Sequence, residues 1–439
     1  MILNLPNSLQ RFIKQIITFI LITGVSRLLP FLLTPIFTNY ISPSSMGVLE
    51  IILAIYSLTI VLGIFQIDTA FQRYFFEEKN IISNSLLIIT VTSIAISFTT
   101  FLLSNKISIY ISGTKQYSHE IITMAATITV ANIYSLLVLA LRFSEKNKEM
   151  IAVILLQSFS FSLLSYILII VNNNGIIGYL NATLYSYIIS SIVTIFYFRK
   201  RLLSDINLAT IKRLVNFSYP QTPARIASVF MQNGNRFIIL LLLGGASVGV
   251  FSISNKMAIL MGIVLSAFCM VWYPILYKDT KNINYKELNN IFKLTLLTLP
   301  VITILLGFIS YILFKYVVNT EYQYGFSTSL ILILSASILI IKEMADIGIK
   351  IKEKTYLISV IYLLCLTLSY LLMFFIAPKL HLEGIALSIL ISNISMLLLT
   401  LFTSNKILKR KPFNITPIYS YIIFCIIYVI LAMNYNHAL

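Results

Sequence analysis

The chain is divided into apolar runs of about twenty residues that are separated by short polar loops. An α-helix rises about 1.5 Å per residue, so a run of this length crosses the roughly 30 Å hydrocarbon core of a bilayer. Only 11% of the 439 residues are charged, whereas about a quarter are charged in a soluble domain. The runs therefore predict an integral membrane protein.

Because lipid offers no hydrogen-bond partner to free backbone groups, each run is predicted to be a helix. A β-barrel is excluded, since its strands need only about ten alternating residues. The runs lie at 12–40, 44–66, 81–103, 119–142, 150–171, 176–198, 217–243, 246–275, 291–316, 327–349, 355–376, 383–404 and 416–434. We expect an all-α fold of about twelve or thirteen transmembrane helices, with the last run either spanning the membrane or partly re-entrant.

Lys and Arg are distributed unevenly between the two sets of loops. Of these 32 residues, 24 lie in the N-terminal stretch and in alternate loops, and the opposite loops hold only Lys106, Lys115, Lys315 and Lys379. Loops rich in Lys and Arg stay in the cytoplasm. We therefore expect an inner (cytoplasmic) membrane protein with a cytoplasmic N-terminus. The net charge of +17 belongs to these loops and does not indicate a nucleic-acid partner.

The sequence also repeats itself. The stretch from Gly178 to Lys200 aligns with Gly384 to Lys406, GVLEI from Gly47 aligns with GVFSI from Gly249, and RFSEK from Arg142 aligns with KIKEK from Lys350. These matches predict two six-helix bundles related by a parallel pseudo-twofold repeat, which is a transporter architecture. The predicted divisions are an N-terminal bundle at 1–200, a cytoplasmic linker at 201–216, a C-terminal bundle at 217–406, and a basic loop with an extra helix at 407–439.

The linker contains a short amphipathic pattern. Ser204 or Asp205 can cap a helix that carries Lys212 and Arg213 on one side and apolar residues on the other. We expect this helix to lie in the membrane interface, attracted by anionic headgroups. It acts either as a hinge that couples the two bundles or as a simple tether.

Four cations lie inside the predicted spans: Arg27, Arg225, Arg236 and Lys256. A charge at mid-membrane costs about 2.5–3.5 kcal/mol on insertion scales, so it usually faces a cavity or a partner. These four residues occur early in each repeat and predict a cationic cleft for an anionic substrate such as a phosphate or pyrophosphate. The alternative is internal ion pairing, and Arg225 can instead reach the inner membrane surface.

Acids at depth are fewer. Glu50, in the second run, is the candidate for ion coupling; its alternative role is as a counter-ion to Arg27 or Lys256. Asp68 and Arg73 are expected to form an interfacial salt bridge, and Lys342 and Asp346 to pair at i,i+4 spacing. Amides at depth are expected to join helices by hydrogen bonds or to line a path for sugar: Asn132, Gln157, Asn181, Asn233, Asn235 and Asn255.

Catalytic and cofactor motifs are absent from the sequence. It has no Walker loop, no cysteine pair with metal-ligand spacing and no histidine cluster. We therefore expect neither an enzyme nor a cofactor. Energy for transport must come from an ion gradient, from the substrate gradient or from a partner.

Three stretches carry distinctive residues: Pro30 to Phe76, with Pro35, Gly47 and Gly63; Leu214 to Leu260, with Pro220, Arg236, Gly249 and Lys256; and Gly175 to Lys200. These stretches resemble bacterial polysaccharide flippases of the multidrug/oligosaccharidyl-lipid/polysaccharide exporter superfamily. One departure is Asn235, because the family often has an acid at that position.

The resemblance implies a protein that moves an undecaprenyl-pyrophosphate-linked oligosaccharide, such as an O-antigen or capsule repeat unit, from the cytoplasmic to the periplasmic leaflet by alternating access. Membrane lipids, a polysaccharide polymerase and a chain-length regulator are the implied partners. A lipid II flippase and a multidrug exporter are alternatives within the same superfamily. An O-antigen polymerase or ligase is an alternative of another class, although such an enzyme would need a longer outer loop.

Overall fold

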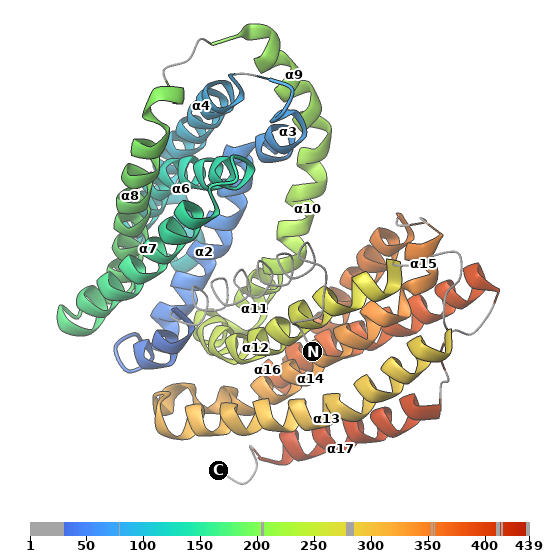
Figure 1. Ribbon diagram of the computed structural model, residues 1–439. Helices are drawn as coiled ribbons and strands as arrows, with labels where there is room; N and C mark the ends of the chain where they lie inside the picture. Colours follow the sequence, from blue (N-terminus) through green and yellow to red (C-terminus); the bar gives the residue numbers. More distant parts are fainter. Residues whose placement is uncertain are drawn as a thin grey trace. The chain divides into compact units, whose positions relative to one another are not determined.

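The computed structural model describes residues 30–78, 80–202, 206–277, 285–352, 354, 356–409, 413 and 416–435 (Figure 1). These residues form helices, turns and loops, with no β-strand among them. Within them, nine helical stretches are long and apolar enough to cross a bilayer. The all-α membrane fold predicted from the sequence is confirmed for this part of the chain.

The chain divides into two compact units, Met1–Phe237 and Ile238–Leu439. The helices that begin in the first unit are α2 (Pro43–Ile64), α3 (Ile67–Tyr74), α4 (Ile81–Leu102), α5 (Ser104–Ser112), α6 (Ser118–Phe143), α7 (Asn147–Ser165), η2 (Tyr166–Val171), α8 (Gly175–Leu202), α9 (Leu208–Ser218), η3 (Tyr219–Gln221), α10 (Thr222–Asn233) and α11 (Asn235–Leu243). Helix α2 packs against α4, α6 and α10, so it lies at the centre of this unit.

The second unit is built around α14, which packs against α12, α13, α16 and α17. Its helices are α12 (Gly245–Tyr277), α13 (Tyr285–Tyr316), η4 (Thr320–Gly325), α14 (Phe326–Ala345), α15 (Ile347–Ile351), α16 (Tyr356–Leu408) and α17 (Thr416–Tyr435). The predicted runs from 44 onward agree with these bounds within a few residues. The predicted run at 217–243 differs, because it is divided among η3, α10 and α11.

Helix α16 is a hairpin of two helices. A straight helix of its 53 residues would be about 80 Å long, far more than a bilayer needs. The backbone turns at His381, where φ is 47° and ψ is −130°. Ser392 Oγ then donates to the Cys365 carbonyl at 2.6 Å, which places the two arms side by side. The two runs predicted at 355–376 and 383–404 are therefore both present.

Two equivalent glycines of the predicted repeat have the same local role. A Cβ on Gly178 would lie 3.0 Å from the Leu168 carbonyl oxygen, and a Cβ on Gly384 would lie 2.8 Å from the Ile376 carbonyl oxygen. In both units, the glycine lets a helix start against the end of the preceding helix. This likeness supports the alignment of 178–200 with 384–406.

The predicted linker helix is present as α9, but its cap differs from the expected one. The side chain of Asn207 accepts a hydrogen bond from the Ala209 amide at 2.9 Å, whereas Ser204 and Asp205 lie outside the described residues. Leu214 is fully buried, and α9 packs against α3 and α4, next to which it lies in Figure 1. One face of this helix is therefore covered by protein.

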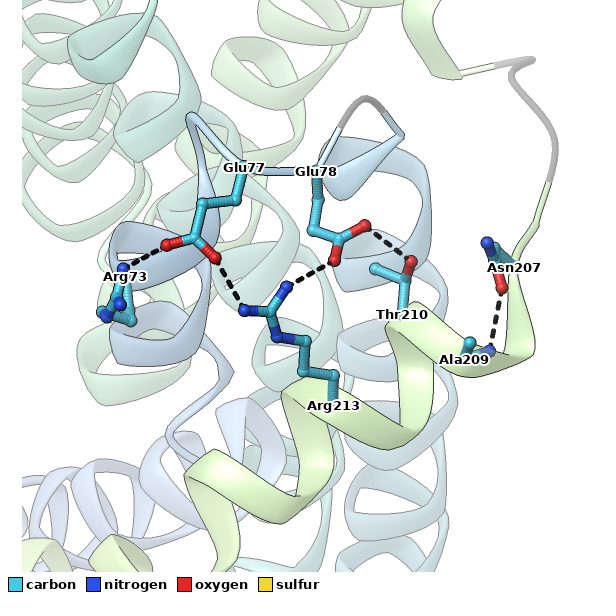
Figure 2. Close-up of polar contacts among 7 residues, drawn as sticks. All are labelled: Arg73, Glu77, Glu78, Asn207, Ala209, Thr210 and Arg213. Atoms are coloured by element: carbon cyan, nitrogen blue, oxygen red, sulfur yellow. Dashed lines mark hydrogen bonds and ion pairs between the residues drawn. The ribbon is translucent and has the colours of Figure 1, made fainter.

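A group of charged residues fastens α9 to the turn between α3 and α4 (Figure 2). The guanidinium of Arg213 lies 2.6 Å from Glu77 and 2.8 Å from Glu78. Thr210 donates to the second Glu78 oxygen at 3.0 Å, and the Arg213 guanidinium lies 4.1 Å from the centre of the Tyr74 ring. We call these residues, together with Arg73, the linker clamp.

The salt bridge expected between Asp68 and Arg73 does not form. Arg73 instead pairs with Glu77, one turn further along, at 2.5 Å. Asp68 Oδ1 is buried and has no hydrogen-bond partner among the described residues, although Arg225 stabilises its charge. Burial raises the pKa of the Asp68 carboxyl, and the positive charge of Arg225 opposes that shift.

Candidate functional site

Helix α2 carries a carboxylate into the interior of the first unit. The helix begins with a Ser42 cap and Pro43 in its first turn, and continues as an almost unbroken apolar sequence. Glu50 follows two turns later, about 10 Å along the helix axis. It is 3% exposed, and its neighbours Ile51 and Ile52 are fully buried. An ionised acid in these surroundings requires a partner.

That partner is Arg236, in the first turn of α11. Its Nη2 atom lies 3.1 Å from Glu50 Oε2, and the side chains of Arg236 and Glu50 are 18% and 4% exposed. Arg236 was predicted as a substrate ligand and Glu50 as a coupling residue or counter-ion. The structure places the two side chains together as a buried ion pair.

Asn233, at the end of α10, completes the group. Its Oδ1 atom accepts a hydrogen bond from Arg236 Nη1, and its Nδ2 atom donates to Ser57 Oγ at 3.1 Å. Glu50 and Ser57 are seven residues apart and therefore share one face of α2. The junction between α10 and α11 is thus bonded to α2 at two points, two helical turns apart. We call Glu50, Ser57, Asn233 and Arg236 the α2 polar cluster.

One donor of the Arg236 side chain makes no hydrogen bond within the α2 polar cluster. Arg236 Nε is buried and has no hydrogen-bond partner among the described residues, and the same holds for Asn235 Oδ1. Guanidinium donors form a planar fork that suits carboxylate or phosphate oxygens. An anionic group that reaches Arg236 would find a preformed donor and would compete with the Glu50 carboxylate for it.

The other predicted cations lie on other elements than Arg236. Arg225 lies exposed in the first turn of α10, where it faces the charge of Asp68. Lys256 lies half-buried on α12 in the second unit. Arg27 lies outside the described residues. Of the predicted set, the structure pairs Arg236 with Glu50.

The second unit contains its own buried charges. Lys342 Nζ lies 3.2 Å from Asp346 and 3.1 Å from Glu343, and Lys350 Nζ lies 3.0 Å from Asp346 and 2.7 Å from Glu343. The predicted pairing of Lys342 with Asp346 is confirmed. Two cations and two anions alternate in a closed ring, so their charges cancel and the ring acts as a structural connection between α14 and α15.

In the sequence, Asn233 is only one of several amides at depth, and Ser57 is not singled out. Two spacings could have indicated the cluster: Glu50 and Ser57 are seven residues apart on one helix face, and Asn233 and Arg236 are three residues apart. The part of the chain that the structure covers has no group of three His, Cys, Asp or Glu side chains that could hold a metal ion.

Comparison with protein families shows a match to the family described as polysaccharide biosynthesis protein, over residues 12–278. Comparison with curated proteins gives no match. Among solved structures, the chain resembles the lipid II flippase MurJ in an inward closed conformation, with a TM-score of 0.72 and 16% identity, covering 95% of this chain and 92% of that one.

The chain also resembles an inward-facing multidrug resistance MATE family transporter of the MOP superfamily, with a TM-score of 0.64 and 16% identity over 87% of this chain and 94% of that one. A third similar structure is a MOP superfamily transporter from Pyrococcus furiosus, described as having a binding pocket of reverse polarity. Its TM-score is 0.53, with 16% identity over 88% of this chain and 93% of that one. The family match covers well over half of the residues, so this multi-pass membrane protein belongs to the polysaccharide biosynthesis protein family and has a fold shared with MurJ and MATE transporters.

Proposed function

We propose that the protein is a flippase that moves an undecaprenyl-pyrophosphate-linked oligosaccharide, such as an O-antigen or capsule repeat unit, from the cytoplasmic to the periplasmic leaflet of the inner membrane by alternating access. The observation that carries this proposal is Arg236, a membrane-embedded cation held by one carboxylate and one neutral amide. Membership of a polysaccharide biosynthesis family and the resemblance to a lipid-linked substrate flippase support it.

The chemistry of the embedded residues favours an anionic substrate. Arg27, Arg225, Arg236 and Lys256 lie in stretches that the sequence assigns to the membrane, and few acids accompany them: Glu50 pairs with Arg236, and Asp68 lies near Arg225. Pyrophosphate accepts forked hydrogen bonds from guanidinium groups, and the polyprenyl chain can remain in lipid. We propose that these cations bind the pyrophosphate. We also propose that Glu50, the carboxylate that pairs with Arg236, couples substrate binding to the binding of a transported ion.

The proposed partners follow from the proposed role in glycan synthesis. A flippase of repeat units hands its product to a polysaccharide polymerase and a chain-length regulator, which are the proposed partners. The distribution of Lys and Arg favours a cytoplasmic N-terminus.

The test uses a deletion strain complemented with the wild type or with Arg236→Ala, and with Gln116→Ala, an exposed residue of the same unit, as a control. Surface glycan and the leaflet that holds complete lipid-linked units are measured, with protein levels determined by immunoblot. We expect the deletion and Arg236→Ala to trap complete units on the cytoplasmic side, and Gln116→Ala to export them. Units that reach the periplasm but remain unpolymerised in the deletion strain would exclude the proposal.

A second candidate is a lipid II flippase, favoured by the TM-score of 0.72 with MurJ. Lipid II also carries a pyrophosphate, so the α2 polar cluster fits both substrates. Depletion of the host's lipid II flippase separates the two candidates. Rescue of growth by this chain would favour lipid II, and failure to rescue together with restored surface glycan would favour the repeat unit.

A further inference from the structure

We propose that Asn233 is a positioning and specificity residue that orients Arg236 through an uncharged acceptor and thereby adds no negative charge to that of Glu50 beside the guanidinium. This inference rests on the proposed function, in which Arg236 receives a pyrophosphate group. It adds a residue whose neutrality, and not only its hydrogen bonds, determines whether an anion can bind.

The direction of the Asn233 amide is determined by its two neighbours. On one side Arg236 Nη1 can only donate, so it requires the Asn233 oxygen. On the other side the Ser57 hydroxyl donates to the Ala54 carbonyl at 2.7 Å, so Ser57 Oγ is left to accept from Asn233 Nδ2 at 3.1 Å. A reversed amide would place donor against donor at Arg236. Asn233 therefore fixes the orientation of the guanidinium fork relative to α2.

The charge around Arg236 follows from this arrangement. Nη2 faces Glu50 at 3.1 Å, Nη1 faces the neutral Asn233, and Nε is buried without a partner among the described residues. An incoming pyrophosphate competes with the Glu50 carboxylate for the guanidinium. An aspartate at 233 has nearly the same shape and still accepts from Arg236, but it adds a second negative charge to the cluster. It would repel an anionic headgroup that a neutral amide admits.

This difference separates a role in specificity from a role in packing. Asn233→Asp keeps the acceptor for Arg236, so a residue needed only for that hydrogen bond would tolerate the change. Asn233→Asp combined with Glu50→Gln restores one carboxylate beside Arg236. If the number of charges determines binding, the double variant recovers affinity that the single variant loses.

The experiment uses the purified full-length protein in lipid nanodiscs, with undecaprenyl pyrophosphate as the probe and undecaprenol as the uncharged control. Binding is measured for the wild type, Asn233→Asp, the double variant, and Gln116→Glu. The last variant places a carboxylate in the same unit, in the exposed turn between α5 and α6, and serves as the charge control. Thermal unfolding of each variant shows whether it is folded.

We expect Asn233→Asp to weaken binding of undecaprenyl pyrophosphate at least tenfold and to leave undecaprenol binding unchanged. The double variant should bind the pyrophosphate probe within about threefold of the wild type, as should Gln116→Glu. Equal binding by the wild type and Asn233→Asp would overturn the role of Asn233 alone. A wild type that does not prefer undecaprenyl pyrophosphate over undecaprenol would overturn the proposed function and this inference together. If Asn233→Asp does not fold, the double variant decides the matter, because a tenfold loss in that variant also overturns the proposal.

Discussion

The Arg236 guanidinium lies 3.1 Å from the Glu50 carboxylate, and both side chains are largely withdrawn from solvent. Such a pair has two consequences. It costs desolvation energy that a pair of apolar residues would not, and it leaves an uncompensated buried charge if one partner is removed. The pair is therefore poorly explained by stability alone, which is consistent with a role in binding.

The first prediction concerns stability. Glu50→Ala should lower the free energy of unfolding by about 3–5 kcal/mol, because Arg236 would remain buried and unpaired. The double variant Glu50→Leu/Arg236→Leu should be less destabilised than the single one, because it leaves no unpaired charge. Thermal unfolding of the purified protein in detergent measures both. A double variant that is as unstable as the sum of the two single variants would contradict the ion pair.

The second prediction concerns affinity. Glu50→Gln should bind undecaprenyl pyrophosphate more tightly than the wild type, because the headgroup no longer competes with a carboxylate for Arg236. Export in cells should nevertheless fall if release of the headgroup depends on the return of Glu50 to Arg236. Equilibrium binding in nanodiscs and surface glycan in the complemented deletion strain are the two measurements. Weaker binding by Glu50→Gln would show that Glu50 contacts the ligand favourably and is not its competitor.

The third prediction concerns the linker clamp and pH. Hydrogen bonds from Arg73 and then Arg213 lower the pKa of Glu77 from its usual 4.5. The folded state therefore holds this carboxylate ionised, and its contribution to stability is present above pH 4.5 and is lost as the pH falls through the lowered value. Burial raises the pKa of Asp68, which has the opposite effect. The measured quantity is thus the difference in unfolding temperature between the wild type and Glu77→Gln, which should shrink below about pH 4.5. A difference that is constant with pH would contradict the prediction.

The helices of this protein could be predicted from the sequence because the physical rule is simple. A span needs about twenty apolar residues, and α2, α4, α6 and α8 follow that rule within a few residues. Helix α9 was predicted from its amphipathic pattern. Its cap was not, because Ser, Asp and Asn all cap well and the sequence offers three candidates within four positions.

The sequence alone predicted only part of the α2 polar cluster. The embedded charges Glu50 and Arg236 are conspicuous in apolar runs, but nothing in a single sequence states that residues 186 positions apart are in contact. The same limit explains the error at Arg73. Asp68 and Glu77 were both within reach along the chain, but Asp68 is buried near Arg225, and Glu77 lies where Arg73 and Arg213, from α9, both pair with it.

The fourth prediction concerns Gly384. A Cβ there would lie 2.8 Å from the Ile376 carbonyl oxygen and 2.9 Å from Ala377 Cα, which are backbone atoms that cannot move away easily. Gly384→Ala should therefore destabilise the α16 hairpin by about 1–3 kcal/mol. Gly262→Ala is the matched control, because nothing lies within 4 Å of the added Cβ. Unfolding temperatures of the two variants test the prediction, and equal values would contradict it.

The last prediction separates the two roles considered for the linker. Arg213, Thr210 and Ser218 bond α9 to the first unit, Ser218 through its hydroxyl to the Gln66 carbonyl at 2.9 Å. If these contacts hold throughout transport, α9 moves as part of that unit and the clamp is not the hinge.

Cysteines at Thr210 and Glu78, in a background without Cys269, Cys365 and Cys425, can be joined by a short bifunctional thiol reagent in membrane vesicles. We expect the joined protein to translocate lipid-linked units at the rate of the single-cysteine controls treated with the same reagent. A joined protein that stops translocating, while the treated controls continue, would show that the clamp opens during each cycle and would favour the hinge.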